Sequence, residues 1–152
     1  MIDVYTDGSF KPPRLGAYGW IVVENEEITH ECVMRVEDTT NNRMELTAIL
    51  EALKSLIDRK KEKIHIHTDS QYAYLSLTQW CARWKNAGWV TVEGSPIKNR
   101  DILEPLHRLF KQSKAEIHWV KAHNGHPYNT AIDRLVQAET KMMSRSLLPI
   151  RK

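Results

Sequence analysis

The sequence predicts an α/β domain on a five-stranded mixed sheet, with three antiparallel strands followed by two parallel strands and with helices on its flanks. Three observations predict this class. The first 36 of the 152 residues hold three strand-like segments with short connections, which is typical of an antiparallel meander. Two later strand segments each follow a helical segment, which favours parallel neighbours joined by crossovers. A chain of this length usually forms a single domain.

The strands are expected where apolar residues alternate with polar ones or run together between turn-forming residues. These segments are residues 2–6, 18–23, 28–36, 64–68 and 115–120. We expect the first strand to end at Asp7-Gly8, a dipeptide typical of turns. We expect Lys11-Pro12-Pro13-Arg14 to form a loop, because proline fixes φ and removes a backbone donor.

The helices are indicated by apolar residues that recur three or four positions apart. The longest has a stripe from Leu46 to Ile57 and is expected to end in the basic run 59–61, where cations suit the helix dipole. We expect residues 70–86 to be helical, as one helix or as two shorter helices, and residues 101–110 to form a further helix. A last helix opens with Pro127, since proline suits the first helical turn.

Composition excludes several classes of protein. The chain is 41% hydrophobic and 27% charged, which fits a globular protein and argues against broad disorder. No segment approaches the roughly 20 apolar residues of a membrane span, and the N-terminus has no secretory signal pattern. Cys32 and Cys81 are too far apart in sequence to form a CxxC pair, so we expect a cytoplasmic protein without a disulfide scaffold. The net charge of +3 is compatible with nucleic-acid binding.

The predicted topology brings two carboxylates together. If the first strand is central, the chain changes sides of the sheet between the first and fourth strands. Ligand sites in such sheets lie beyond the carboxyl ends of the strands at this switch point. Asp7 and Asp69 end these two strands and would stand side by side.

Four acidic residues are the candidate catalytic and metal-binding residues: Asp7, Glu45, Asp69 and Asp133. Simpler explanations exist for three of them. Asp7 suits a turn, Asp69 suits a helix N-cap, and Glu45 suits a capping box with Asn42 as the cap. Asp133 has no such explanation, because it lies inside a helix without a cation three or four residues away.

Together these carboxylates predict a metal site. Carboxylates brought close together raise one another's pKa unless a cation neutralises them. Oxygen ligands without cysteine suit Mg²⁺ or Mn²⁺ rather than zinc. Two such ions can activate water and stabilise the leaving oxygen of a phosphodiester, so the expected chemistry is metal-assisted phosphodiester hydrolysis.

Five motifs in order resemble type-1 ribonuclease H. They are Thr6-Asp7-Gly8-Ser9, the segment from Thr39 to Leu46, the segment from Thr68 to Tyr72, the segment from Trp119 to His126, and Asn129 followed by Asp133. The resemblance implies an RNase H-like fold with a catalytic domain over residues 1–143. We expect residues 144–152 to form a flexible tail, because chain ends fray unless they are held. It implies an endonuclease that cleaves the RNA strand of an RNA–DNA hybrid and leaves 3′-hydroxyl and 5′-phosphate ends.

The resemblance also assigns catalytic roles. Asp7, Glu45, Asp69 and Asp133 match the family's metal-binding carboxylates, which hold two Mg²⁺ ions, with Mn²⁺ as a substitute. His123 matches a loop histidine that assists proton transfer or product departure. Histidine titrates near neutral pH, which suits that role.

Substrate contacts follow from the same resemblance. Thr40 and Asn99 match a pocket for a DNA-strand phosphate, and Asn41 and Gln71 match minor-groove contacts, where 2′-hydroxyls distinguish RNA from DNA. The family also has a handle region, in which aromatic side chains and cations contact the backbone of the hybrid. Its counterparts here are Trp80, Trp84 and Trp89, together with Arg83 and Lys85. Trp80 and Trp84 also have the spacing of residues that face a helical core.

One segment departs from the family pattern. The glycine-rich stretch after the first aspartate is replaced here by Phe10 to Gly16, which lacks an asparagine that contacts RNA in the family.

Two other functions remain open, since fold does not fix function. One is a DNA nuclease on the same scaffold, such as a Holliday-junction resolvase or an integrase-like enzyme, and the other is a non-enzymatic hybrid-binding module. For the leading interpretation we expect a monomer that removes RNA primers or R-loops, alone or with a replication-protein partner.

Overall fold

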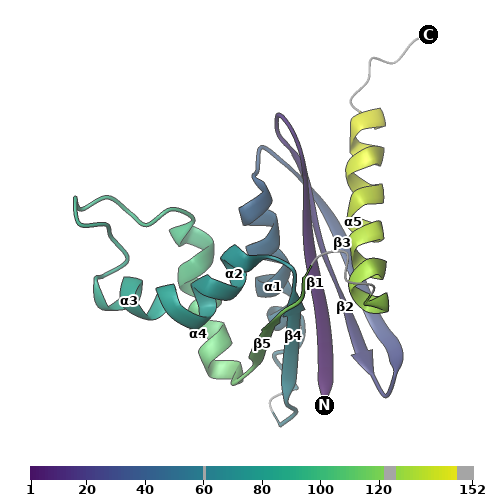
Figure 1. Cartoon of the computed structure of the whole chain (residues 1–152), viewed down its shortest axis with the longest axis horizontal. Coiled ribbons are helices and arrows are strands. Elements are labelled where there is room, and N and C mark those ends of the chain that lie inside the picture. The colour runs from purple at the N-terminus through teal and green to yellow at the C-terminus, as the bar shows by residue number, and fades with distance from the viewer. Residues whose placement is uncertain (60, 122–125, 147–152) are drawn as a thin grey trace.

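The sheet of the computed structural model has its strands in the order β3-β2-β1-β4-β5 (Figure 1). The pairs β1–β2 and β2–β3 are antiparallel, whereas β1–β4 and β4–β5 are parallel. The strands are β1 Ile2–Lys11, β2 Leu15–Glu24, β3 Glu27–Glu37, β4 Ile64–Thr68 and β5 Glu116–Trp119. The mixed sheet predicted from the sequence is therefore confirmed, with β1 at its centre.

The structure describes residues 1–59, 61–121 and 126–146, and for residues 142–146 it describes the backbone alone. The helices are α1 Asn41–Ser55, α2 Gln71–Leu75, the π-helix η1 Ser76–Trp80, α3 Cys81–Asn86, α4 Arg100–Ser113 and α5 Pro127–Ser146. Within these ranges, no helix is both long and apolar enough to cross a membrane. The last helix continues beyond residue 143, where the sequence predicted the start of a tail. Residues 147–152 of that predicted tail lie outside the described ranges.

The first strand is longer than predicted. It pairs with β2 from Asp3 opposite Val23 as far as Lys11 opposite Leu15, whereas its parallel pairing with β4 ends at Tyr5. The expected end at Asp7-Gly8 was wrong, because β2 continues to offer backbone partners after β4 has ended. Asp7 is thus held in a strand and not in a turn.

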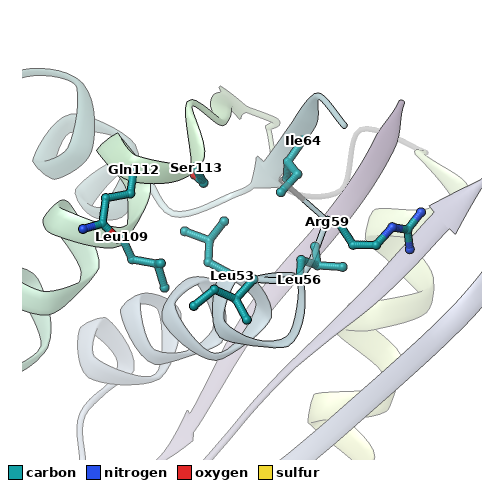
Figure 2. A pocket seen from close by; sticks show the side chains of 8 residues that line it. Leu53, Leu56, Arg59, Ile64, Leu109, Gln112 and Ser113 are labelled. Atoms are coloured by element: carbon teal, nitrogen blue, oxygen red, sulfur yellow. The ribbon is translucent and has the colours of Figure 1, made fainter. Parts of the chain in front are cut away.

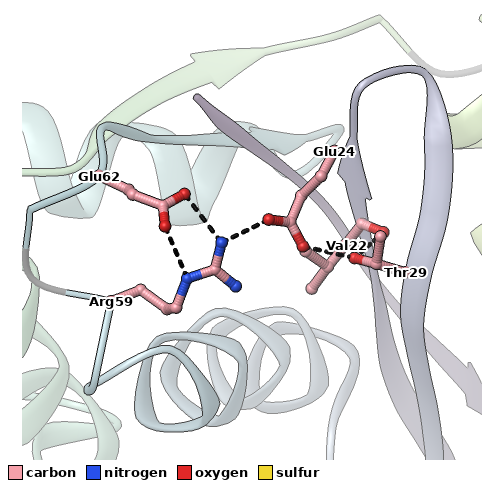
Figure 3. Close-up of polar contacts among 5 residues, drawn as sticks. All are labelled: Val22, Glu24, Thr29, Arg59 and Glu62. Atoms are coloured by element: carbon pink, nitrogen blue, oxygen red, sulfur yellow. Dashed lines mark hydrogen bonds and ion pairs between the residues drawn. The ribbon is translucent and has the colours of Figure 1, made fainter.

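The end of α1 also differs from the prediction. The helix ends at Ser55 and not in the basic run 59–61. Figure 3 shows Arg59 turned back toward two carboxylates. Its guanidinium donates to both oxygens of Glu62, at 2.9 and 2.8 Å, and to Glu24 at the end of β2. Acidic partners outside the helix therefore hold Arg59, and they tie the connection after α1 to the β2–β3 hairpin.

Helices cover both faces of the sheet. Alternation along the strands directs Val4 and Ile66 into the larger core with α1 and α4. Tyr5 points to the other face, where it packs in a smaller core with Ile132 and Val136 of α5. Figure 1 shows α5 on the opposite side of the sheet from α1 and α4. The carboxylates of β1 and α5 consequently share one face.

An apolar hollow of about 350 Å³ lies where α1, β4 and α4 meet. Its walls include Leu53, Leu56, Ile64 and Leu109, which Figure 2 shows converging from the three elements. The hollow is at the opposite end of β4 from Asp69, because Ile64 is the first residue of that strand. It is therefore not part of the carboxylate site.

Candidate active site

Asp7 and Asp69 are placed by neighbouring parallel strands. Tyr5 in β1 lies opposite His67 in β4. Two residues further along, on the same face, come Asp7 in β1 and Asp69 directly after β4. The two carboxylates therefore lie side by side where parallel pairing ends, which is the switch point predicted from the sequence.

Glu45 reaches this place from α1, and Gly8 makes the approach possible. A Cβ atom on Gly8 would lie 2.6 Å from the backbone nitrogen of Glu45 and 2.7 Å from the carbonyl carbon of Met44. Both atoms belong to the helix backbone, which cannot rotate away as a side chain can. Only glycine therefore lets α1 lie this close to β1, and the close packing buries Glu45 to 5% exposure beside Asp7.

The carboxylates form one cluster. One oxygen each from Asp7, Glu45 and Asp69 lies within 4.8 Å of the others. Asp133, half-buried on α5 beside the buried Ile132, is near enough for its charge to raise the pKa of Asp7 and of Asp69. Four segments that are distant in sequence thus supply four carboxylates to one place.

The cluster opposes its own ionisation. Burial is the largest cause that raises the pKa of Asp7 to about 9, and the charges of Asp69 and Asp133 add to it. Burial, followed by the charges of Asp7 and Asp69, also raises the pKa of Glu45 well above its usual range. The pKa of Asp69 is raised mainly by burial, and the charge of Asp133 adds to the shift. A bound cation would remove this cost of ionising the cluster.

The donor set fits a hard divalent cation. Among the described residues, Oδ2 of Asp7 and Oε1 of Glu45 are buried without a hydrogen-bond partner. The other oxygen of Asp7, Oδ1, accepts the backbone N–H of Gly8 at 2.9 Å. Buried oxygens normally have partners, so these free oxygens are available as metal ligands. An all-carboxylate set is typical of Mg²⁺ or Mn²⁺ sites.

The start of α1 does not form the capping box that was the simpler explanation for Glu45. Thr40 is the N-cap, and its hydroxyl accepts the backbone N–H of Arg43 at 3.2 Å. The simpler explanation for Glu45, a capping box with Asn42, does not hold, because Thr40 caps the helix and Glu45 is buried in the carboxylate cluster. Asn41, the first residue of α1, is exposed.

Asn99 is linked to Thr40 through Arg43. The Oδ1 of Asn99 accepts from the Arg43 guanidinium at 3.3 Å, and its Nδ2 donates to the Tyr72 hydroxyl at 3.1 Å. Arg43 also donates two hydrogen bonds to Asp101, at 2.9 and 2.7 Å. Sequence reasoning missed these roles of Arg43 and Asp101, because they lie 58 residues apart and no local pattern links them.

The helical run from α2 to α3 begins at the exposed Gln71 and has Trp80 and Trp84 on one side. The two indole rings are half-buried, with centroids 5.8 Å apart, and both line an open groove of about 630 Å³ that extends to Val92. Trp89 is different, because it is only 6% exposed and packs in the larger core. Trp80 and Trp84 are therefore partly accessible, whereas Trp89 is structural.

Two predicted features remain. His123 lies outside the described residues, so its role stays a prediction. The segment from Phe10 to Gly16 forms the end of the β1–β2 hairpin, in which Lys11 lies opposite Leu15. The altered segment is thus a tight hairpin end that continues the strand holding Asp7.

The comparisons with known proteins agree with this geometry. The sequence profile of the RNase H family matches residues 1–141. The chain belongs to the RNase H family. The family predicted from the sequence motifs is therefore confirmed, and the chain is a nuclease of that family.

Bacterial proteins of this family are similar over nearly their whole length. A ribonuclease H of Cupriavidus necator is 35% identical over 145 residues, which cover 95% of this chain and 98% of the relative. A ribonuclease H of Pseudoalteromonas atlantica is 40% identical over 149 residues, which cover 97% and 94%. The similarity thus spans nearly the whole of both relatives.

Solved structures share the fold. LC9-RNase H1, described as a type 1 RNase H with the type 2 active-site motif, is 25% identical with a TM-score of 0.78, over 93% of this chain and 72% of that one. A foamy viral protease-reverse transcriptase in complex with an RNA/DNA hybrid is 20% identical with a TM-score of 0.81, over 93% of this chain and 20% of that one. The second likeness supports the fold alone.

Proposed function

We propose that this chain is an endonuclease that hydrolyses the RNA strand of RNA–DNA hybrids. The observation that carries the proposal is the buried cluster of Asp7, Glu45 and Asp69, with Asp133 beside it, in a chain of the RNase H family. Relatives at 35% and 40% identity bear the name ribonuclease H. All four acidic residues are present, which favours an enzyme over a module that only binds hybrids.

The four carboxylates would hold two Mg²⁺ ions, with Mn²⁺ as a substitute. When bound, these ions supply a nucleophilic water at neutral pH and stabilise the charge that develops on the leaving oxygen. Asp7 and Glu45 contribute the two free buried oxygens, and the low-dielectric surroundings strengthen their attraction for a cation. Hydrolysis on this scheme leaves a 3′-hydroxyl and a 5′-phosphate. His123 would assist proton transfer or product departure.

Substrate contacts would lie on the side of α1 and α2. Thr40 and Asn99, joined through Arg43, would grip a phosphate of the DNA strand at the positive N-terminal end of α1. The exposed side chains Asn41 and Gln71 would contact the minor groove, where polar groups read the 2′-hydroxyls of the RNA strand.

The helical run from α2 to α3 would extend the substrate surface. Trp80 and Trp84 are half-buried, so each indole is both packed and accessible. Aromatic surfaces next to cations such as Arg83, which lines the same groove, suit contacts with sugars and phosphates. The enzyme would act as a monomer that removes RNA primers or R-loops, alone or with a replication-protein partner.

The test is a comparison of substrates with end-labelled strands in Mg²⁺. An RNA–DNA hybrid is incubated beside single-stranded RNA, double-stranded RNA, double-stranded DNA and a four-way DNA junction. We expect cleavage of the RNA strand of the hybrid alone. Asp7→Asn should abolish it, whereas Asp3→Asn, on the same face of β1 but outside the cluster, should not. Cleavage of the junction, or of the DNA strand, would refute the proposed substrate.

A further inference from the structure

A second group of possible metal ligands lies on β4 and β5. Alternation places His65 and His67 on one face of β4, and Glu116 and His118 on the same face of β5, with Ile66 and Ile117 in the core behind them. The strand register sets His65 opposite Glu116 and His67 opposite His118. The sheet itself thus brings two imidazoles and a carboxylate together.

Three atoms of this group define a metal-sized space. Nδ1 of His65 lies 2.9 Å from Nε2 of His118, and Oε2 of Glu116 lies 3.4 Å from the first nitrogen and 3.9 Å from the second. A triangle with sides of 2.9, 3.4 and 3.9 Å has a point about 2.0 Å from every corner. Zinc binds histidine nitrogen at about 2.0–2.1 Å and carboxylate oxygen at about 2.0–2.2 Å. The three atoms therefore need little movement to hold one ion.

Neighbouring contacts hold these side chains in place. The other oxygen of Glu116, Oε1, is 3.5 Å from the ammonium of Lys63, which itself donates to the carbonyl of Lys114 at 2.8 Å. This contact leaves Oε2 directed at the imidazoles. The ring of His118 lies nearly parallel to those of His65 and His67, at interplanar angles of 19° and 25° and with both centroid distances 5.2 Å. The ligand atoms are thus oriented before any ion binds, which lowers the cost of binding.

The group is also accessible. The side chain of His65 is 19% exposed, that of His118 44% and that of Glu116 53%. The last helix packs mainly over β1, β2 and β3. Within the part of the chain that the structure describes, it therefore leaves this face of β4 and β5 accessible to an ion. Water can complete the coordination, as it does where zinc has three protein ligands.

We propose that His65, Glu116 and His118 bind one divalent transition-metal ion of the zinc type, separately from the catalytic carboxylates. Imidazole nitrogens suit zinc, copper, iron or nickel, whereas the all-oxygen cluster at Asp7 suits magnesium or manganese. His65 is four residues before Asp69, roughly 13 Å along the strand at 3.3 Å per residue, so the two sites do not share ligands.

Without a metal ion, the two ring nitrogens of His65 and His118 are joined by a hydrogen bond. One of the two facing ring nitrogens, on His65 or His118, carries a proton and donates it to the other. Binding a metal breaks that hydrogen bond and requires the proton to move to the second nitrogen of its ring, which leaves both rings neutral. The bound ion would then join β4 to β5, which is an edge strand of the sheet.

The test measures Zn²⁺ binding to the whole chain by titration calorimetry in excess Mg²⁺, which occupies the carboxylate cluster. We expect one equivalent of Zn²⁺ to bind. His65→Gln and His118→Gln should each weaken this binding at least about tenfold. Even the substitution of a residue that only supports a metal ligand lowers metal affinity by about 10–100-fold. The matched control is His30→Gln, because His30 is an exposed histidine on β3 outside the group, and binding should be unchanged.

A second measurement covers the case in which a histidine variant does not fold. Imidazole resonances of the unchanged chain are followed by NMR while Zn²⁺ is added in excess Mg²⁺. We expect the ring signals of His65 and His118 to change together at one equivalent, and that of His30 to stay fixed. No Zn²⁺ binding in excess Mg²⁺, binding unaffected by both substitutions, or ring signals that do not respond would each overturn the proposal.

Discussion

The carboxylate cluster predicts an unusual response of the metal-free protein to pH. Burial and the neighbouring charges raise the pKa of Asp7 from 3.8 to about 9 in the folded chain. Between these two values the folded state holds a proton that the unfolded state has released. The free energy of unfolding should therefore fall as the pH rises through this window.

The size of the effect follows from the shift. One proton held by the folded state alone changes the free energy of unfolding by about 1.36 kcal/mol per pH unit. From about pH 5.5 to about pH 8, which is some 2.5 units inside the window set by Asp7, the loss is about 3 kcal/mol. Glu45 has a pKa raised in the same direction, so its titration does not reverse the trend.

The assay is urea unfolding in a metal chelator at these two pH values, for the unchanged chain and for Asp7→Asn. The variant lacks the titrating carboxyl, so its loss of stability over the same range should be clearly smaller. Mg²⁺ added at the higher pH should restore stability to the unchanged chain, because the cation favours the ionised carboxylates. Stability that rises with pH in the chelator, or an equal loss in both proteins, would refute the reasoning.

Three further predictions concern the surroundings of the site. Gly8→Ala should push α1 away from β1, cost about 1–3 kcal/mol of stability in thermal unfolding and lower kcat by displacing Glu45; unchanged kcat would contradict the role of the close approach. Arg43→Gln should raise KM for the hybrid with little change in kcat, because Asn99 loses its partner, and stability should change by less than about 1 kcal/mol. Thr40→Ala should cost about 1 kcal/mol in urea unfolding, and Thr40→Ser, which keeps the cap, should cost less; equal losses would argue against capping.

The sheet order and the pairing of Asp7 with Asp69 could be predicted from the sequence. The order followed from the succession of strands and helices, and the pairing followed from both residues lying just beyond the parallel pairing of β1 with β4, at a switch point. The length of β1 could not be predicted, because Asp7-Gly8 is a common turn sequence. Gly8 serves here as the contact point for α1, and such a contact is visible only after the helix is placed.

The capping of α1 and the environment of Asn99 were beyond local patterns for a similar reason. Asn42 and Glu45 fit a capping box by spacing, but Glu45 is drawn instead into a cluster with carboxylates from other segments. The hydrogen bonds from Arg43 to Asn99 and Asp101 link α1 to the start of α4. Contacts between such distant segments depend on packing, which periodicity and capping rules do not encode.

The most direct test of the central claim is to compare Mg²⁺ binding with cleavage of the hybrid in the same samples. The claim is that Asp7, Glu45, Asp69 and Asp133 together hold the cations on which the hydrolysis depends. We expect calorimetry to show Mg²⁺ binding to the unchanged chain, and Asp7→Asn to lose binding and RNA-strand cleavage together. Cleavage in a chelator, or cleavage by Asp7→Asn at the rate of the unchanged chain, would contradict the claim.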